Sequence, residues 1–150
     1  MSLDGSYDPQ NIFARMLRGE MPCHKVFEDE VALAFMDIFP QAPGHTLVIP
    51  KTAARNLLDL PAAAIGPYME RVQTVARAVR TALQPDGLQI VQFNGGPAGQ
   101  TVFHIHFHII PRSAGSVLTP HGLGGRADDT VLAAQAAAIA TALRDGSRGG

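Results

Sequence analysis

The sequence has one cysteine and no tryptophan among its 150 residues. A single thiol, Cys23, permits no internal disulfide and no zinc site built from several thiolates. The sequence also lacks an apolar run long enough to cross a membrane, and it lacks the basic start and apolar stretch of a secretory signal. We therefore expect a reduced, soluble, cytoplasmic protein with no membrane partner.

Charge is scarce as well. Charged residues make up 17% of the sequence, and twelve Lys and Arg residues against thirteen Asp and Glu residues give a net charge of −1. Proteins that bind nucleic acids or anionic membranes nonspecifically usually present a strongly basic surface. The near-neutral balance argues against both roles, and we expect no nucleic-acid partner.

Length and periodicity predict one α+β domain. The 46% hydrophobic content is enough for one core, and no repeat or long Pro/Gly-rich linker divides the chain. We predict a single domain over 1–150, with its core at about 9–112 and a tail of loop and helix at 113–150. The predicted elements are a helix from Asp8-Pro9 to about Gly19, a hairpin at 25–38, a central strand at 45–51, a helix from Leu60-Pro61 to the stop at 85–87, strands at 88–94 and 101–110, and a helix at 128–145. The last helix is expected to be capped by the acidic pair at its start. Short connections between strands favour an antiparallel sheet with helices on one face.

Three of the six histidines occupy alternate positions in "TVFHIHFHIIPR", residues 101–112. On a strand, His104, His106 and His108 would share one face, and Phe103, Ile105, Phe107 and Ile109 would share the other. Three buried imidazoles without polar partners would cost several kcal/mol. A purely structural row of histidines is therefore disfavoured.

Two chemical interpretations of the row remain. Histidines two positions apart can share a metal ion, with Asp37 and His45 as the further ligand candidates. However, the sequence has no helical His-Glu-x-x-His and no paired cysteines, and we predict no metal ligand and no cofactor. Alternatively, a neutral histidine acts as a nucleophile, with neighbours that fix its tautomer and a second acid for the leaving group. The Gly-rich turn "NGGPAGQT", residues 94–101, directly precedes the row, and its N–H groups could bind a phosphate.

The segment "HIHFHII" resembles the His-φ-His-φ-His-φ-φ signature (φ, apolar) of the histidine triad (HIT) superfamily of nucleotide hydrolases and transferases. "GQTVFHIHFHIIPR" is similar to the form found in bacterial members and in the dinucleoside-polyphosphate hydrolase branch. "NIFARMLRGEMP" and "VFEDEVALAFMDIFPQAPGHTLVIPK" resemble the N-terminal half of the family, so the resemblance runs from about Asn11 to Arg112. It implies a HIT-like α+β fold: a five-stranded antiparallel sheet with a long helix and a short N-terminal helix on it, plus a C-terminal helix.

The resemblance also implies a mechanism. His106 would attack the α-phosphorus of a nucleotide, and water would hydrolyse the resulting nucleotidyl-histidine. His108 would assist the leaving group, His104 would orient the nucleophilic ring, and His45 would complete the histidine network.

The same resemblance implies a nucleotide pocket. Asp37 would accept from the ribose hydroxyls, and Asn94 would lie at the ribose–phosphate end. Gln100 and Thr101 would hold phosphate oxygens beside the Gly99 backbone. The base would enter an apolar slot, whose residues would be assigned to the core by spacing alone: Ile12, Phe13, Met16, Phe35 and Ile38.

One departure from the family concerns metal. Some bacterial members hold a structural zinc with Cys-x-x-Cys at the positions of Asn11 and Ala14, and both cysteines are absent here. The resemblance therefore gives no support for zinc. Cys23, His24 and His121 carry no signature and are assigned no role.

The expected substrate is a purine nucleotide conjugate, with adenosine phosphoramidates preferred and dinucleoside polyphosphates second. The alternative from another class is a non-catalytic nucleotide-binding regulatory module. The resemblance further implies a homodimer, formed through the long helix and the strand at 88–94.

Overall fold

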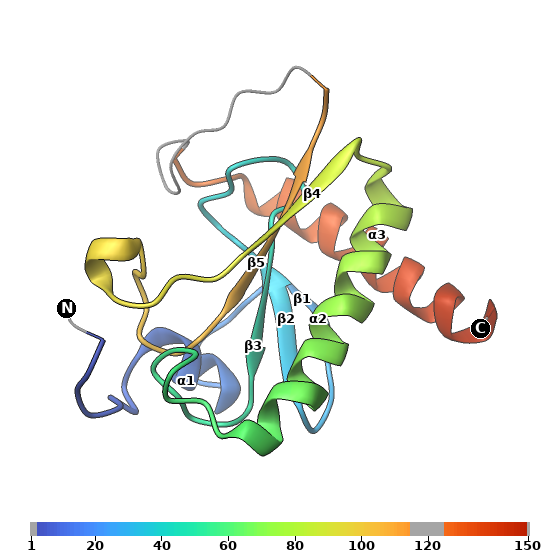
Figure 1. Ribbon diagram of the computed structural model, residues 1–150. Coiled ribbons are helices and arrows are strands. Elements are labelled where there is room, and N and C mark those ends of the chain that lie inside the picture. The colour runs from blue at the N-terminus through green and yellow to red at the C-terminus, as the bar shows by residue number, and fades with distance from the viewer. Residues whose placement is uncertain (1–2, 115–124, 150) are drawn as a thin grey trace.

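The computed structural model describes residues 3–114 and 125–149 (Figure 1). His121 and most of the loop predicted after Pro111 lie outside the described residues. The elements, in chain order, are α1 Ile12–Leu17, β1 Lys25–Glu28, β2 Ala32–Met36, β3 Thr46–Pro50, α2 Ala62–Leu83, β4 Gly87–Val91, the 3-10 turn η1 Gly96–Ala98, β5 Phe107–Arg112 and α3 Asp129–Gly149.

The five strands form one antiparallel sheet in the order β1-β2-β3-β5-β4. This confirms the predicted α+β class and the central place of β3, whose five residues are all buried. β5 lies between β3 and β4, and its His108 is paired with Leu47 of β3 and Val91 of β4. The sheet therefore holds His108 from both sides.

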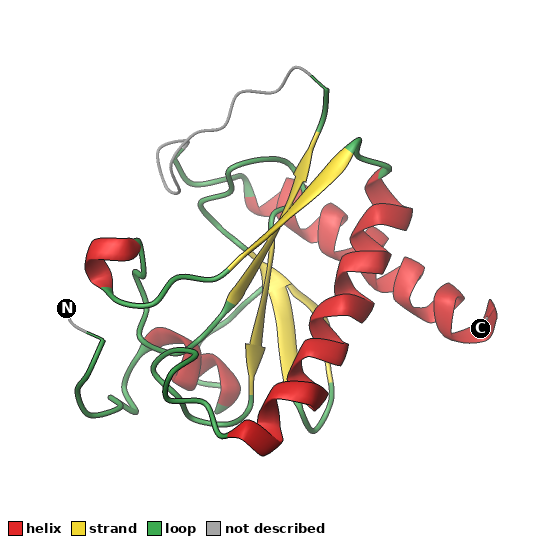
Figure 2. Ribbon diagram, viewed as in Figure 1, coloured by secondary structure: helices red, strands yellow, loops and turns green. Residues whose placement is uncertain are grey.

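The helices cover both faces of the sheet, and not one face as the strand pattern had suggested. α2 and α3 contact each other and pack on the face that carries Val48 and Ile109. α1 packs on the opposite face, where Phe13 meets Phe35 and Leu47. Figure 2 shows the two long helices together on one side of the strands and α1 apart from them. Because β2 and β3 are buried at every position, both faces of the sheet are covered.

The histidine segment is shorter as a strand than predicted. β5 begins at Phe107 and not at residue 101, so His104 and His106 precede the strand. Ahead of β5, the Ile105 N–H donates to the Ala54 carbonyl at 2.9 Å, outside the sheet. The predicted alternation still holds from Ile105 onward, because Ile105, Phe107 and Ile109 join the core under α2. Phe103 instead lies against the Arg55 guanidinium, 4.6 Å from its ring centre.

Helix boundaries also differ from the predictions at α1. Asp8-Pro9 forms a turn, and the helix begins at Ile12 with Asn11 as its N-cap. The Asn11 side chain accepts from the Ala14 N–H at 2.9 Å, which satisfies one of the unpaired donors of the first turn. At α3 the predicted acidic cap is present, since the Asp128 side chain accepts from the Thr130 N–H at 2.7 Å. Within the described residues, no helix is both long and apolar enough to cross a membrane.

Candidate active site

A pocket of about 880 Å³ opens between α1 and the sheet. Its lining includes nine of the predicted site residues: Ile12, Phe13, Met16, Phe35, Asp37, Ile38, Thr101, His106 and His108. The apolar slot and two of the three triad histidines are therefore brought together as predicted. Five others are not among the lining residues: His45, Asn94, Gly99, Gln100 and His104.

His106 is held with one ring nitrogen turned to the main chain. Its Nδ1 lies 2.8 Å from the carbonyl oxygen of His104. A carbonyl oxygen only accepts, so Nδ1 carries the proton and Nε2 carries the lone pair of the neutral ring. The Phe13 ring packs edge-on at 4.9 Å and fixes the ring plane. His106 thus has the tautomer that a nitrogen nucleophile needs.

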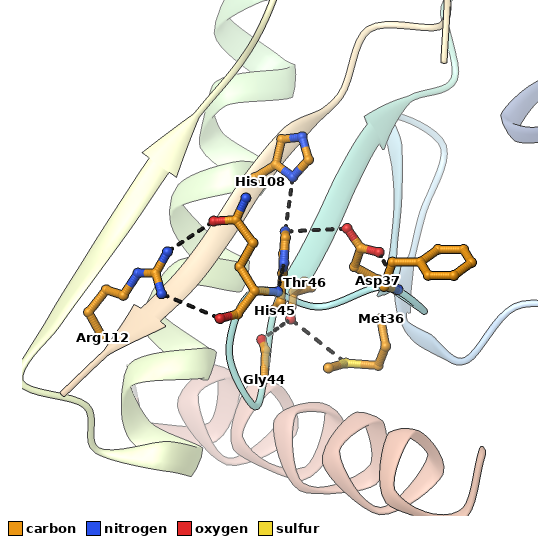
Figure 3. Close-up of polar contacts among 9 residues, drawn as sticks. Met36, Asp37, Gly44, His45, Thr46, His108 and Arg112 are labelled. Atoms are coloured by element: carbon orange, nitrogen blue, oxygen red, sulfur yellow. Dashed lines mark hydrogen bonds and ion pairs between the residues drawn. The ribbon is translucent and has the colours of Figure 1, made fainter. Parts of the chain in front are cut away.

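His108 receives its tautomer through His45. The Gln41 main-chain N–H donates to His45 Nδ1 at 2.9 Å, so the proton of the neutral His45 ring is on Nε2. That Nε2 lies 2.9 Å from His108 Nδ1, which therefore accepts (Figure 3). The proton of neutral His108 is then on Nε2. A ring that presents N–H can donate to a leaving group, whereas His106 presents a lone pair.

The loop that carries His45 is anchored at two points. Gly44 adopts φ +90°, a conformation that favours glycine, and a Cβ there would overlap Leu83 Cδ1 and lie 3.2 Å from Pro111 Cγ. Arg112 donates from NH2 to Gln41 Oε1 at 2.9 Å and from Nε to Gln89 at 2.7 Å. Arg112 therefore links the loop to β4 and holds the residue whose N–H fixes the His45 tautomer.

The His104 carbonyl orients the His106 ring, and the His104 ring bonds to two other groups. The ring Nε2 lies 2.8 Å from the Pro50 carbonyl, and Nδ1 lies 2.6 Å from the Tyr7 hydroxyl. Burial lowers the pKa of His104 to about 4, and the nearby His106 acts in the same direction. The ring is therefore neutral at physiological pH. Tyr7 was missed from the sequence because it precedes the segment that resembles the family.

The amide side chains of the Gly-rich turn bond to main-chain groups of the turn and of the loop before α2. Gln100 accepts from the Gly95 N–H at 2.8 Å and donates to the Arg55 carbonyl at 2.6 Å. Asn94 accepts from the Leu57 N–H at 2.9 Å. Both side chains stabilise the turn, and Thr101 is the turn residue that lines the pocket. Substrate contacts from Asn94, Gly99 and Gln100 stay predictions.

Asp37 is 4% exposed and still lines the pocket. One carboxylate oxygen accepts from the Phe39 N–H at 2.8 Å, and the other lies 3.4 Å from His45 Nε2. A buried carboxylate with fixed orientation is a suitable acceptor for paired hydroxyls. This placement agrees with the expected ribose contact, which stays a prediction.

The pocket lining also includes polar groups and a thiol for which the sequence predicted no role. Its lining includes Cys23, His24, Arg126 and Asp129. Asp129 Oδ1 lies 3.0 Å from His24 Nε2 and 3.1 Å from Arg126. These hydrogen bonds, from His24 first and Arg126 second, lower the pKa of Asp129, and partial burial raises the pKa of Cys23. No periodicity or motif marks these residues, because the tail brings them together across a hundred positions.

The metal interpretation can be tested against the donor atoms. In residues 3–114 and 125–149, Asp37, His45 and His108 offer ligand atoms within 4.8 Å of one another. However, the Gln41 N–H occupies His45 Nδ1, so a metal at Nε2 would require an imidazolate or the loss of that hydrogen bond. At the positions of the family's Cys-x-x-Cys, Asn11 caps α1 and Ala14 is buried. The arrangement of Asp37, His45 and His108 therefore favours hydrogen bonds among these side chains over metal binding.

Comparisons with known proteins show the family of the chain. A family model described as "HIT domain" matches residues 18–115. The Bacillus subtilis protein named "Protein hit" is 46% identical over 101 residues, which cover 67% of this chain and 70% of that protein. An Arabidopsis thaliana protein named "Adenylylsulfatase HINT3" is 37% identical over 101 residues, covering 67% of this chain and 51% of that one.

Solved structures show the same fold. A Bartonella henselae Hit-like protein, described with an unknown ligand, has a TM-score of 0.85 and 46% identity, covering 92% of this chain and 99% of that chain. A zinc-bound histidine triad family protein from Mycobacterium smegmatis has a TM-score of 0.82 and 34% identity, covering 94% and 98%. The chain belongs to the HIT domain family, whose superfamily comprises nucleotide-binding proteins and hydrolases.

Proposed function

We propose that this protein is a nucleotide hydrolase or transferase that cleaves at the α-phosphate of purine nucleotide conjugates. Adenosine phosphoramidates are the preferred class. One observation carries the proposal: His106 Nδ1–H is fixed on the His104 carbonyl, while the ring beside it, His108, is fixed in the opposite tautomer. The two ring centres are 5.1 Å apart, so one phosphoryl group can contact both.

The first step forms the nucleotidyl-enzyme. His106 Nε2 attacks the α-phosphorus, and the bond from phosphorus to the leaving nitrogen or oxygen breaks. The leaving atom takes the proton of His108 Nε2, and solvent water returns a proton to that nitrogen, so the His108 ring stays neutral. Bonding to phosphorus makes the His106 ring cationic, and the His104 carbonyl that accepts from Nδ1 stabilises that charge.

The second step regenerates the enzyme. The proton that the attacking water gives up goes to solvent, and His108 keeps its proton on Nε2. The water oxygen bonds to phosphorus as the bond to His106 Nε2 breaks, which releases the nucleoside monophosphate. A different nucleophile in place of water would give a transferase.

The pocket supports a nucleoside as the group that is held. The planar base would lie against Ile12, Phe13 and Ile38, and Asp37 would accept from the ribose hydroxyls. The Arabidopsis relative is named as an adenylylsulfatase, which supports adenylyl conjugates as the substrate class. Dinucleoside polyphosphates are the second candidate, because "GQTVFHIHFHIIPR" resembles the branch that hydrolyses them.

The test is a rapid quench with an adenosine phosphoramidate, followed by intact-mass analysis and peptide mapping under conditions that preserve phosphohistidine. We expect a nucleotidyl adduct on the peptide that carries His106. The matched variant is His106→Ala, which should form no adduct and lose at least about 10³-fold in kcat while it still binds AMP. Full activity in that variant would show that the nucleophile is another residue.

Failure of both substrate classes, with AMP still bound, would instead support the non-catalytic nucleotide-binding module. Calorimetric titration with AMP separates that outcome from an unfolded or inactive preparation. An adduct with a dinucleoside polyphosphate alone would keep the mechanism and change the leaving group.

We also propose that the protein is a homodimer. β4 is an edge strand, and its Ile90 is 44% exposed. On α2, Ile65 and Met69 are 39% and 37% exposed. A second copy would cover this apolar surface. Light scattering should give twice the chain mass, and Ile90→Lys should reduce it toward one chain.

A further inference from the structure

The residues ahead of α1 lie along the loop that supports the histidine segment. Asn56 Nδ2 donates to the Leu3 carbonyl at 2.9 Å, and Arg55 donates to the Ser6 carbonyl at 3.3 Å. Between them, Gly5 has φ +139°, and a Cβ there would lie 3.4 Å from the Arg55 guanidinium carbon. These contacts fix the N-terminal segment, residues 3–7, which ends at Tyr7.

Tyr7 ends this segment with its hydroxyl against the first triad histidine. The hydroxyl oxygen lies 2.6 Å from His104 Nδ1, and the two rings meet edge-on at 5.7 Å. Because the Pro50 carbonyl must receive the proton on Nε2, Nδ1 is an acceptor and the phenol donates. Both ring nitrogens of the buried His104 are thereby satisfied, and the ring has one orientation.

The orientation of His104 matters because its carbonyl receives His106 Nδ1–H. His104 precedes β5, so sheet pairing does not hold its peptide group. Its neighbour Ile105 bonds to Ala54, in the same loop that holds the N-terminal segment. The carbonyl is therefore positioned by that one main-chain bond and by the His104 side chain.

We propose that Tyr7 is a positioning residue for the nucleophile. Its hydroxyl holds the His104 ring, the ring holds its own main-chain carbonyl, and that carbonyl holds the His106 tautomer with Nε2 aimed into the pocket. The proposal rests on the assignment of His106 as nucleophile in the proposed function. It extends the site to a residue outside the matched HIT domain, which begins at residue 18.

The chain offers a matched pair of variants, since Tyr7 and Tyr68 are its only tyrosines. Tyr68 also donates one hydroxyl hydrogen bond, to the Val48 carbonyl at 2.7 Å, but it is a residue of α2 and is buried in the core. Tyr7→Phe and Tyr68→Phe each remove one hydroxyl and keep the ring. A purely structural effect would appear in both, and a positioning effect would appear in Tyr7→Phe alone.

We expect Tyr7→Phe to slow single-turnover nucleotidylation about 5- to 10-fold, the usual effect of one lost hydrogen bond. KM and the affinity for AMP should each change less than about twofold, because Tyr7 contacts neither base nor phosphate in the proposed complex. Tyr68→Phe should lower the unfolding midpoint and leave the nucleotidylation rate unchanged. An unchanged rate in Tyr7→Phe, or equal losses in both variants, would overturn the proposal.

Ring ¹⁵N spectra give a second readout that needs no substrate. In the unmodified protein we expect His104 as the single Nε2–H tautomer and a slowly exchanging Nδ1–H on His106. Tyr7→Phe should mix the His104 tautomers and weaken the His106 signal. If the unmodified protein forms no adduct, the proposed function fails, and the spectra alone then test the positioning role. Unchanged His104 and His106 signals in Tyr7→Phe would refute that role. Altered signals would support it.

Discussion

His45 Nε2 lies 2.9 Å from His108 Nδ1 and 3.4 Å from an oxygen of Asp37, with all three side chains buried. One N–H therefore faces both His108 and the Asp37 carboxylate, and both of these side chains line the pocket. The Gln41 N–H donates to the other ring nitrogen of His45, so moving the ring proton to Nδ1 would break that hydrogen bond. The geometry of a loop outside the signature thus determines which nitrogen of His108 carries a proton.

The first prediction concerns that proton. His108→Ala should lose at least about 100-fold in kcat with an alkyl phosphoramidate, because the basic amine then leaves without a general acid. The leaving group of adenosine 5′-(p-nitrophenyl phosphate) needs no proton. With this substrate the loss in kcat should be about tenfold or less, because no general acid is required. Steady-state kinetics with the two substrates measures the difference.

The control for this prediction is His106→Ala, which should be inactive with both substrates because the nucleophile is gone. Equal losses of His108→Ala on the two substrates would show that His108 contributes by binding phosphate and not by proton transfer.

The second prediction concerns metal. Since the His45 Nδ1 position is taken by the Gln41 N–H, the Asp37, His45 and His108 group should not need an ion for the reaction. The kcat of protein dialysed against a strong chelator should stay within about twofold of its value before dialysis, because removing an ion that takes no part leaves the site intact. Elemental analysis of the same sample checks that the metal was removed. A loss of activity that zinc restores would favour the metal interpretation.

The sequence predicted the sheet, its central strand and the residues of the apolar slot, because these depend on periodicity and on local signals. It also predicted His106 and His108 in one pocket. It placed His104 on the same strand, since nothing in "TVFHIHFHIIPR" shows that pairing begins only at Phe107. Where a strand begins depends on its partner, and the pairing of β5 with β3 begins at Phe107.

Long-range contacts account for the residues that the sequence analysis missed. Tyr7 reaches His104 across 97 positions, and His24 reaches Asp129 across 105. Each is a side-chain contact between segments far apart in the sequence, so neither spacing nor propensity could predict it. The opposite placement of α1 has a different cause, since an all-apolar strand shows that both faces are covered but not by which helix.

The third prediction concerns pH and His104. An unfolded histidine takes up a proton as the pH falls through about 6.5, whereas burial lowers the pKa of His104 in the folded protein to about 4. Between these values the unfolded state binds more protons, so acid favours unfolding. The free energy of unfolding should fall by about 3 kcal/mol between pH 6.5 and 4, and His104 should add nothing further below that range.

Urea titrations at a series of pH values measure this slope. His104→Gln removes the titrating group and should show a smaller decrease over the same interval, even if it is less stable throughout. Equal slopes for the two proteins would show that other groups cause the acid sensitivity.

The fourth prediction concerns Gly44, which sets the turn before His45. In Gly44→Ala, the new Cβ would overlap Leu83 Cδ1, and the residue would also have to hold φ +90°. We expect a loss of about 2 to 4 kcal/mol in the free energy of unfolding, from the strained backbone and the overpacking together.

Gly66 provides the matched substitution. It lies inside α2, and a Cβ there would meet nothing within 4 Å. Gly66→Ala should therefore stabilise the protein by about 0.5 to 1 kcal/mol, through better helix propensity alone. Because Leu83 ends α2 and the turn at Gly44 rests on it, Gly44→Ala should also displace His45 and lower kcat, whereas Gly66→Ala should leave kcat unchanged. Urea unfolding and turnover measured on the two variants would separate the two effects. A stable, fully active Gly44→Ala protein would show that the His45 turn tolerates a side chain and that its glycine is not needed to place the histidine.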